Sequence, residues 1–234
     1  MIRAADFDSI SVGLPPEWAT LPLEQQTFDR FVTDLRTRWR DEPSFDRTTE
    51  RRAELLLNRV RGELRRLNVR YAAMYLESPP DGAVGDDAET LMAACTLATY
   101  TQADLETTLP LTHANLLAAF VVKRKGGAGG ATRDADRRMV DIEPPTKHDL
   151  RIGRAIRLRR LYEMRQSIAT ETQRLYIETF VVPVGEDATT CGVLQFVTPN
   201  LPMARAFSSL FVAIAETVVL LTPDQETEIA AIRP

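Results

Sequence analysis

The sequence predicts an α+β fold in which helices cover both faces of an antiparallel β-sheet, with a helical hairpin inserted near the N-terminus. Residues 176–182 and 191–197 form two strands separated by a short polar turn, and each strand carries apolar side chains at alternating and at intervening positions. Such strands belong to a sheet whose two faces are both covered. Apolar residues at helical spacing follow over 207–218, and two more helical stripes occur over 28–39 and 53–67.

The N-terminal part predicts a strand followed by the helical hairpin. In SISVGLPPEW the apolar residues alternate with small or polar ones until the proline pair ends the strand. The helix over 28–39 stops at the following DEP, and the next helix opens near Asp46, a suitable N-cap. We interpret residues 23–68 as two antiparallel helices joined by a short connection.

The rest of the chain predicts one sheet and its covering helices. The proposed domain spans 1–222, and a polar tail follows over 223–234. Its further elements are strands over 69–78 and 90–101, a short helix over 111–120, a flexible loop over 123–138, a basic strand over 152–164, the strand pair described above, and a last helix with Pro202 in its first turn.

Composition and charge exclude several classes of protein. The 234 residues carry a net charge of −4, which argues against a surface that tracks nucleic acid, and the arginines of helix 46–68 are interleaved with acidic residues. No apolar run approaches the roughly 18 residues that cross a bilayer, and MIRAADFDSI does not have the form of a signal peptide. We expect a cytoplasmic protein without nucleic-acid or membrane partners, in which Cys95 and Cys191 are buried thiols.

No residue pattern predicts catalysis, a metal site or a cofactor. His113 and His148 have no neighbouring ligands, so we interpret the first as a helix-cap or surface residue and the second as a loop residue. The serines at 208–209 lie in a helix without a glycine elbow, and Cys191 has no cationic neighbour. The glycines at 126–130 follow their lysines, which favours a flexible loop over a phosphate-binding loop.

The basic strand holds the residues that most suggest binding. Its apolar phase changes at Leu161, so the pair Arg159-Arg160 predicts a β-bulge. The arginines would bind an acidic partner, since guanidinium groups suit carboxylates, or would pair with carboxylates of adjacent elements; the sequence leaves both open. The predicted partner-binding residues are Arg157, Arg159, Arg160 and Tyr162, and the internal carboxylates are Glu178, Glu171 and Asp149.

Two parts of the chain resemble a known family. SVGLPPEW is similar to an opening strand, proline and tryptophan, and the order of a basic strand, YIETFVVPVGEDATTCGVLQFVTPN and a helix ending FVAIAETVVLL is similar to a closing one. Together they resemble the PsbP-like superfamily, which includes DcrB and LpqN-type proteins, over the first strand and residues 69–221. The resemblance implies a non-enzymatic protein that binds other proteins as an adaptor or chaperone for secreted effectors. The missing export signal and the hairpin over 23–68 depart from the lipoprotein members.

From these observations we expect a non-catalytic, cytoplasmic protein-binding module that is associated with a secretion system or a toxin. Its partner would be an acidic or amphipathic segment that docks on the sheet face or in the groove of the hairpin. The alternative is a small-molecule sensor or carrier with a pocket between the sheet and the hairpin. No cofactor is expected, and the sequence does not predict an oligomeric state.

Overall fold

The computed structural model describes residues 9–40, 47–77, 91–122, 137–165, 172–184 and 188–221, and an eight-stranded sheet lies at its centre. The strand order is β2-β3-β4-β9-β8-β7-β5, with β6 also paired to β7, and every pairing is antiparallel. The strands are β2 (Trp18–Thr20), β3 (Val69–Glu77), β4 (Leu91–Thr101), β5 (Arg137–Asp141), β6 (Thr146–Leu150), β7 (Gly153–Arg165), β8 (Thr172–Val184) and β9 (Thr190–Thr198).

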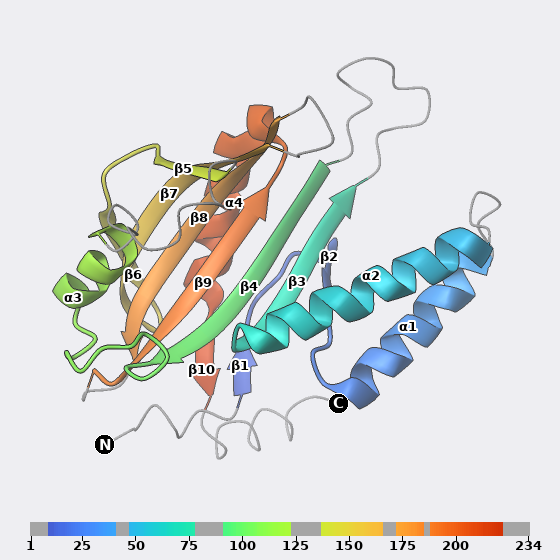
Figure 1. Cartoon of the computed structure of the whole chain (residues 1–234), viewed down its shortest axis with the longest axis horizontal. Helices are drawn as coiled ribbons and strands as arrows, with labels where there is room; N and C mark the ends of the chain where they lie inside the picture. Colours follow the sequence, from blue (N-terminus) through green and yellow to red (C-terminus); the bar gives the residue numbers. More distant parts are fainter. Residues whose placement is uncertain are drawn as a thin grey trace.

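Helices cover both faces of this sheet, as predicted (Figure 1). One helix packs on the first face; on the second face a helical hairpin lies over the β3 end and a short helix lies over β7 and β8. The α+β class and the inserted hairpin are therefore confirmed. The helices are α4 (Ala204–Thr217) on the first face, and α1 (Gln25–Arg40), α2 (Arg47–Arg66) and α3 (His113–Leu117) on the second, with a π-helical turn (Ala118–Val122) after α3 and a 3-10 turn (Leu201–Met203) before α4.

An aromatic core holds α4 against the sheet. Its apolar residues recur at helical spacing and so form one inward stripe. The ring of Phe211 stacks on Phe196 of β9 with centroids 4.6 Å apart, and Phe196 meets Phe180 of β8 edge to face at 6.2 Å. All three side chains are completely buried. Burying one such ring contributes roughly 1.5–3 kcal/mol, so this cluster is the main anchor of α4.

The hairpin packs less completely. Phe28 and Val32 of α1 are buried against Val69, Ala72 and neighbouring apolar residues of the sheet. On α2 only part of the predicted apolar stripe reaches this cluster, through residues 57 and 64. The other leucines and the valine of α2 and its end are exposed by 38–64%: Leu55, Leu56, Val60 and Leu67.

A second, two-stranded sheet joins the two ends of the described chain. β1 (Ser9–Ser11) pairs with β10 (Val219–Leu221), which follows α4 where the sequence predicted a longer helix. Beside it, the Gly13 N–H donates to the hydroxyl of Thr217 at 2.8 Å, and this hydroxyl oxygen lies 3.1 Å from the Gly13 carbonyl. A Cβ on Gly13 would come within 2.9 Å of the Thr217 Cβ, so only glycine fits this approach.

Four short strands were missed by the sequence analysis. β2 follows the proline pair, β5 includes two residues of the predicted loop over 123–138, β6 contains His148, and β10 replaces the last turn of the predicted helix. Strands of three to five residues are too short to show an alternating pattern, and their state is decided by pairing with a longer neighbour. Residues 123–136 of the predicted loop and the tail over 223–234 lie outside the described residues.

The predicted β-bulge at Arg159-Arg160 is wrong. The register of β7 on β8 runs without a break from Ile156 opposite Val181 to Arg165 opposite Thr172. The change of phase needs no bulge because both faces of β7 are covered: Arg160 lies on the apolar α3 face, where it is 4% exposed. An interruption occurs instead in β3, between Val69 and Tyr71.

No helix in the described part of the chain is both long enough and apolar enough to cross a bilayer.

Candidate functional site

Arg157, a predicted partner-binding residue, lies in a buried polar network beneath α4. Its Nε donates to Oε1 of Glu178 at 2.6 Å, and its Nη2 donates to the Ser208 hydroxyl at 2.9 Å. The other oxygen of Glu178 accepts from Ser208 at 2.8 Å and from the Tyr176 hydroxyl at 2.7 Å. Burial is the main reason that the pKa of Tyr176 rises to about 12, which keeps this donor protonated. The network fixes α4 to β7 and β8.

Arg160 and Arg159 are also paired within the chain. The Nε of Arg160 donates to Asp141 of β5 at 2.7 Å, and its Nη2 donates to the carbonyl of Phe120 at 2.9 Å. Arg159 forms an ion pair with Glu143, and its side chain is 27% exposed. These contacts tie β5 and the π-helical turn to β7.

The four predicted residues do not form one patch. Because alternate side chains of a strand face opposite sides, Arg157 and Arg159 lie on the α4 face, whereas Arg160 and the half-buried Tyr162 lie on the α3 face. Of the internal carboxylates considered, Glu178 pairs with Arg157, Asp149 pairs with Arg154 at 2.8 Å, and Glu171 lies outside the described residues. Partner binding by these arginines stays a prediction.

Each histidine contacts a polar group of another element, and both cysteines are buried. Nε2 of His113 lies 2.6 Å from the carbonyl oxygen of Arg154, and Nε2 of His148, which belongs to β6 and not to a loop, lies 3.1 Å from Glu216. Both cysteines are free and buried, as predicted. Burial raises the pKa of each thiol to about 12, so they stay protonated and weakly nucleophilic at neutral pH.

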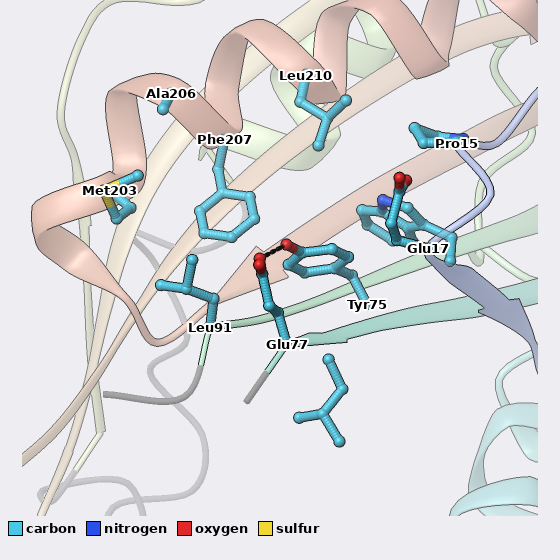
Figure 2. A pocket seen from close by; sticks show the side chains of 11 residues that line it. Pro15, Glu17, Tyr75, Glu77, Leu91, Met203, Ala206, Phe207 and Leu210 are labelled. Carbon is cyan, nitrogen blue, oxygen red and sulfur yellow. Dashed lines mark hydrogen bonds between the residues drawn. The ribbon is translucent and has the colours of Figure 1, made fainter. Parts of the chain in front are cut away.

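A groove of about 540 Å³ lies between the N-terminal half of α4 and the β2-β3-β4 end of the sheet. Figure 2 shows Phe207 and Leu210 extending from α4 toward Tyr75 and Leu91. Met203 and Ala206 line the helix side further along. The groove is open to solvent, and its wall is mainly apolar.

Pairing between β2 and β3 builds the aromatic side of the groove. Trp18 lies directly opposite Tyr75 in the register, and their ring centroids are 5.9 Å apart. Tyr75 then meets Phe207 of α4 edge to face at 6.1 Å. Three rings from three elements thus form a continuous surface, in geometries that aromatic pairs favour.

Two carboxylates border this apolar surface. Glu77 accepts a hydrogen bond from the hydroxyl of Tyr75, and this contact, with burial and the charge of Glu17, raises the pKa of Tyr75 to about 12. Neither Glu17 nor Glu77 forms an ion pair with any described lysine or arginine. The groove therefore combines apolar side chains with negative charge that is not neutralised by the described residues.

One polar atom beside the groove has no hydrogen-bond partner in the described part of the chain. Trp18 is 7% exposed, and its indole Nε1 is buried without a hydrogen-bond acceptor among the described residues. A buried donor in this state costs about 1–3 kcal/mol. The wall of the groove therefore contains a buried hydrogen-bond donor without a described acceptor, whereas the donors of the network beneath α4 that are described above each have one.

Sequence reasoning did not find this groove. Trp18, Tyr75 and Phe207 all carry apolar side chains that the pattern places in the core, and no motif distinguishes a residue at the open end of a core from one inside it. The only signal was the proline pair before Trp18, which predicts that the chain turns away from the sheet.

No protein-family model matches the chain, and a search of curated proteins finds no match to it.

Proposed function

We propose that the chain is a non-catalytic, cytoplasmic protein-binding module, of the adaptor or chaperone kind associated with secretion or a toxin, and that its partner docks in the groove between α4 and β3. The observation that carries the proposal is the combination of aromatic and aliphatic side chains with the carboxylates of Glu17 and Glu77, which form no ion pair with the described lysines and arginines. Surfaces that bind proteins are enriched in aromatic residues and methionine at their centre and are polar at their rim.

The groove supports this function better than the arginines of β7 do. Arg157, Arg159 and Arg160 each contact a carboxylate already, so an acidic partner would have to displace Glu178, Glu143 or Asp141. Displacing Glu178 would also break the buried hydrogen bonds of its carboxylate, which costs a large amount of free energy. The groove offers apolar contact without breaking any described ion pair. The resemblance to PsbP-like proteins supports the proposal because members of that superfamily mostly bind other proteins.

The second candidate is a small-molecule sensor or carrier that uses the same groove. Its volume of about 540 Å³ falls within the range of roughly 300–1,000 Å³ that is usual for small-ligand sites. The location differs from the prediction, since the groove lies between the sheet and α4 and not between the sheet and the hairpin.

A selection from a random peptide library displayed on phage, with the full chain immobilised, tests the first candidate. Met203 lines the groove, and Met92 lies on the other sheet face; both are 42% exposed, so Met203→Lys and Met92→Lys are matched changes. We expect enriched peptides to bind the original chain and Met92→Lys but not Met203→Lys. Peptides that bind all three equally, or no enrichment, would contradict docking in the groove.

The second candidate is tested by thermal unfolding with a panel of apolar amines and other small amphiphiles. A compound that binds the folded chain raises the melting temperature. A rise that is present in Met92→Lys and absent in Met203→Lys, together with failure of the peptide selection, would favour the small-molecule function.

A further inference from the structure

Beside the groove, β3 has a backbone position that no residue in the described part of the chain pairs with on its outer side. In antiparallel sheets, opposite residues alternate between pairs that exchange both backbone hydrogen bonds and pairs that exchange none. Leu21 N–H donates to the carbonyl of Ala72 at 2.9 Å, so Ala72 turns its backbone groups toward β2. Met74, opposite Ala19, and then Leu76 must do the same by alternation.

The pairing with β4 leads to the same orientation for Leu76. Its opposite residue is Met92, whose N–H donates to Oδ1 of Asn200 at 2.7 Å and whose carbonyl accepts from the Thr198 hydroxyl at 2.6 Å. Met92 thus turns its backbone groups away from β3, and the pair Leu76–Met92 exchanges no hydrogen bonds. The N–H and C=O of Leu76 therefore point to the outer edge of the sheet.

β2 does not extend far enough to meet these groups. Its pairing with β3 ends at Trp18 opposite Tyr75, because the chain turns there: Trp18 N–H donates to the carbonyl of Pro15 at 3.1 Å. Leu76 is one position beyond that end, and it has no partner on this side within the described residues. Leu76 and Glu77 also line the groove. A strand position that none of the described residues occupies thus lies directly next to the apolar wall.

We propose that the partner is an extended peptide segment that adds to the sheet edge at Leu76 in line with β2, with leucine-like and basic side chains facing the groove. This inference rests on the proposed function of the groove as a protein-binding site. Unpaired strand edges pair readily with other chains, and main-chain hydrogen bonds then give affinity while alternate side chains give specificity.

The surroundings of Leu76 set the chemistry of that segment. The partner residue opposite Leu76 would exchange two backbone hydrogen bonds with it and point its side chain away from the groove. The neighbours of that residue would face the groove, on the same side as Tyr75 and Glu77. An apolar side chain there meets the Tyr75 and Phe207 rings, and a lysine or arginine meets the carboxylates of Glu77 and Glu17. The expected pattern is apolar or basic residues at every second position.

The probe is a fluorescein-labelled peptide, Lys-Thr-Leu-Thr-Lys-Thr-Leu-Thr-Lys, whose leucines and lysines share one face of a strand. Its binding to the full chain is measured by fluorescence polarisation. A peptide with glutamate in place of lysine should bind at least about tenfold more weakly, since it brings like charges to Glu17 and Glu77. Equal binding of the two peptides would overturn the basic preference.

The backbone part of the inference is tested by methylation of peptide nitrogens. Methylating the threonine nitrogens removes the N–H that would bond to the Leu76 carbonyl and should weaken binding by about tenfold, which matches the loss of one or two hydrogen bonds. Methylating the leucine nitrogens, which would point away from β3, is the matched control and should weaken binding far less. Equal losses would overturn strand addition.

Leu76 offers a matching pair of changes in the chain. Leu76→Pro removes the edge-facing N–H without removing a β3–β4 hydrogen bond, and proline is tolerated at such edge positions. Leu76→Ala keeps that N–H. We expect Leu76→Pro to lose the probe and Leu76→Ala, which keeps the N–H but removes part of the lining, to weaken binding much less, with both variants folded by circular dichroism. If Met203→Lys abolishes binding while Leu76→Pro weakens it no more than Leu76→Ala does, the groove function holds and strand addition is wrong. Absence of probe binding overturns the inference and leaves the phage selection to decide the function.

Discussion

Arg157 and Glu178 form an ion pair between the sheet and α4, with 2.6 Å between Nε and Oε1. Glu178 has no exposed surface. A second exchange of hydrogen bonds through Ser208 links the pair to α4 itself. Arg157, one of the four residues predicted to bind a partner, therefore helps to hold α4 on the sheet.

Removing Arg157 should destabilise the protein strongly. Arg157→Ala leaves the carboxylate of Glu178 buried without its cation, which typically costs about 3–5 kcal/mol. Arg154→Ala is the control, because Arg154 pairs with Asp149 at the exposed surface, where solvent screens the ion pair and its contribution to stability is small. Urea unfolding measures both, and similar losses in the two variants would contradict the role of the buried network.

The double variant Arg157→Leu, Glu178→Leu should recover most of the stability lost in Arg157→Ala. It replaces a desolvated ion pair by apolar side chains beside the ring of Phe180, and such replacements are often neutral or stabilising. A double variant no more stable than Arg157→Ala would show that the network contributes through its geometry and not only through paired charge.

Stability should fall at alkaline pH because of the two cysteines. Burial raises the pKa of Cys95 and Cys191 from 9.0 to about 12, so the unfolded chain loses these protons first. The corresponding stability is complete below about pH 9 and is lost as the pH rises toward 12, by about 1.4 kcal/mol per pH unit for each thiol. Urea unfolding between about pH 8 and 10 should show this slope, and the variant Cys95→Ala, Cys191→Ala should show a flatter one. An unchanged slope would exclude the thiols as its cause.

Phe28→Ala should loosen the hairpin without releasing α4. Phe28 is completely buried, and the Arg61 guanidinium carbon lies 4.7 Å from its ring centroid. Truncating such a ring costs about 3–5 kcal/mol in a well-packed core. Hydrogen exchange should accelerate in α1 and α2 and remain slow in α4, which belongs to a separate apolar cluster. Leu56→Ala, 62% exposed on α2, should change neither rate; acceleration in α4 as well would mean that the hairpin and α4 unfold together.

Gly13→Ala should destabilise the joined chain ends. The added methyl group would approach the Thr217 side chain to 2.9 Å, and overpacking of this kind costs about 1–3 kcal/mol. Thr217→Ser keeps the hydroxyl that accepts from Gly13 and removes one of the crowded atoms, so the pair Gly13→Ala, Thr217→Ser should regain part of the loss in thermal unfolding. If the double variant is no more stable than Gly13→Ala, the loss of stability does not come from crowding against Thr217.

The central strands and the main helices could be predicted because their patterns are long. β3, β4, β8 and β9 carry apolar residues on both faces, and α4 has a clean inward stripe. β2, β5, β6 and β10 could not be predicted, since each has three to five residues and exists through its neighbour. The buried state of Arg160 was equally hidden, because its partner Asp141 lies on one of these missed strands.

The candidate groove was beyond sequence reasoning for a different reason. Its aromatic and aliphatic side chains are of types that are common in protein cores. The backbone of Leu76 has no described strand partner because β2 stops at Trp18 while β3 continues to Glu77. That difference in strand length depends on the turn at Pro15, and the sequence predicted the proline turn but not the short strand after it. The ion pair between Arg157 and Glu178 is one of the internal pairings that the sequence allowed beside partner binding.

The clasp between Gly13 and Thr217 joins residues 204 positions apart. During translation, Gly13 leaves the ribosome long before Thr217 is made, and β1 has no strand to join until β10 follows. Closing a loop of this size is entropically costly and slow compared with local pairing. β1 therefore cannot form this pairing until residues 219–221 have been synthesised, so the two-stranded sheet closes after the strands of the central sheet are already available to pair.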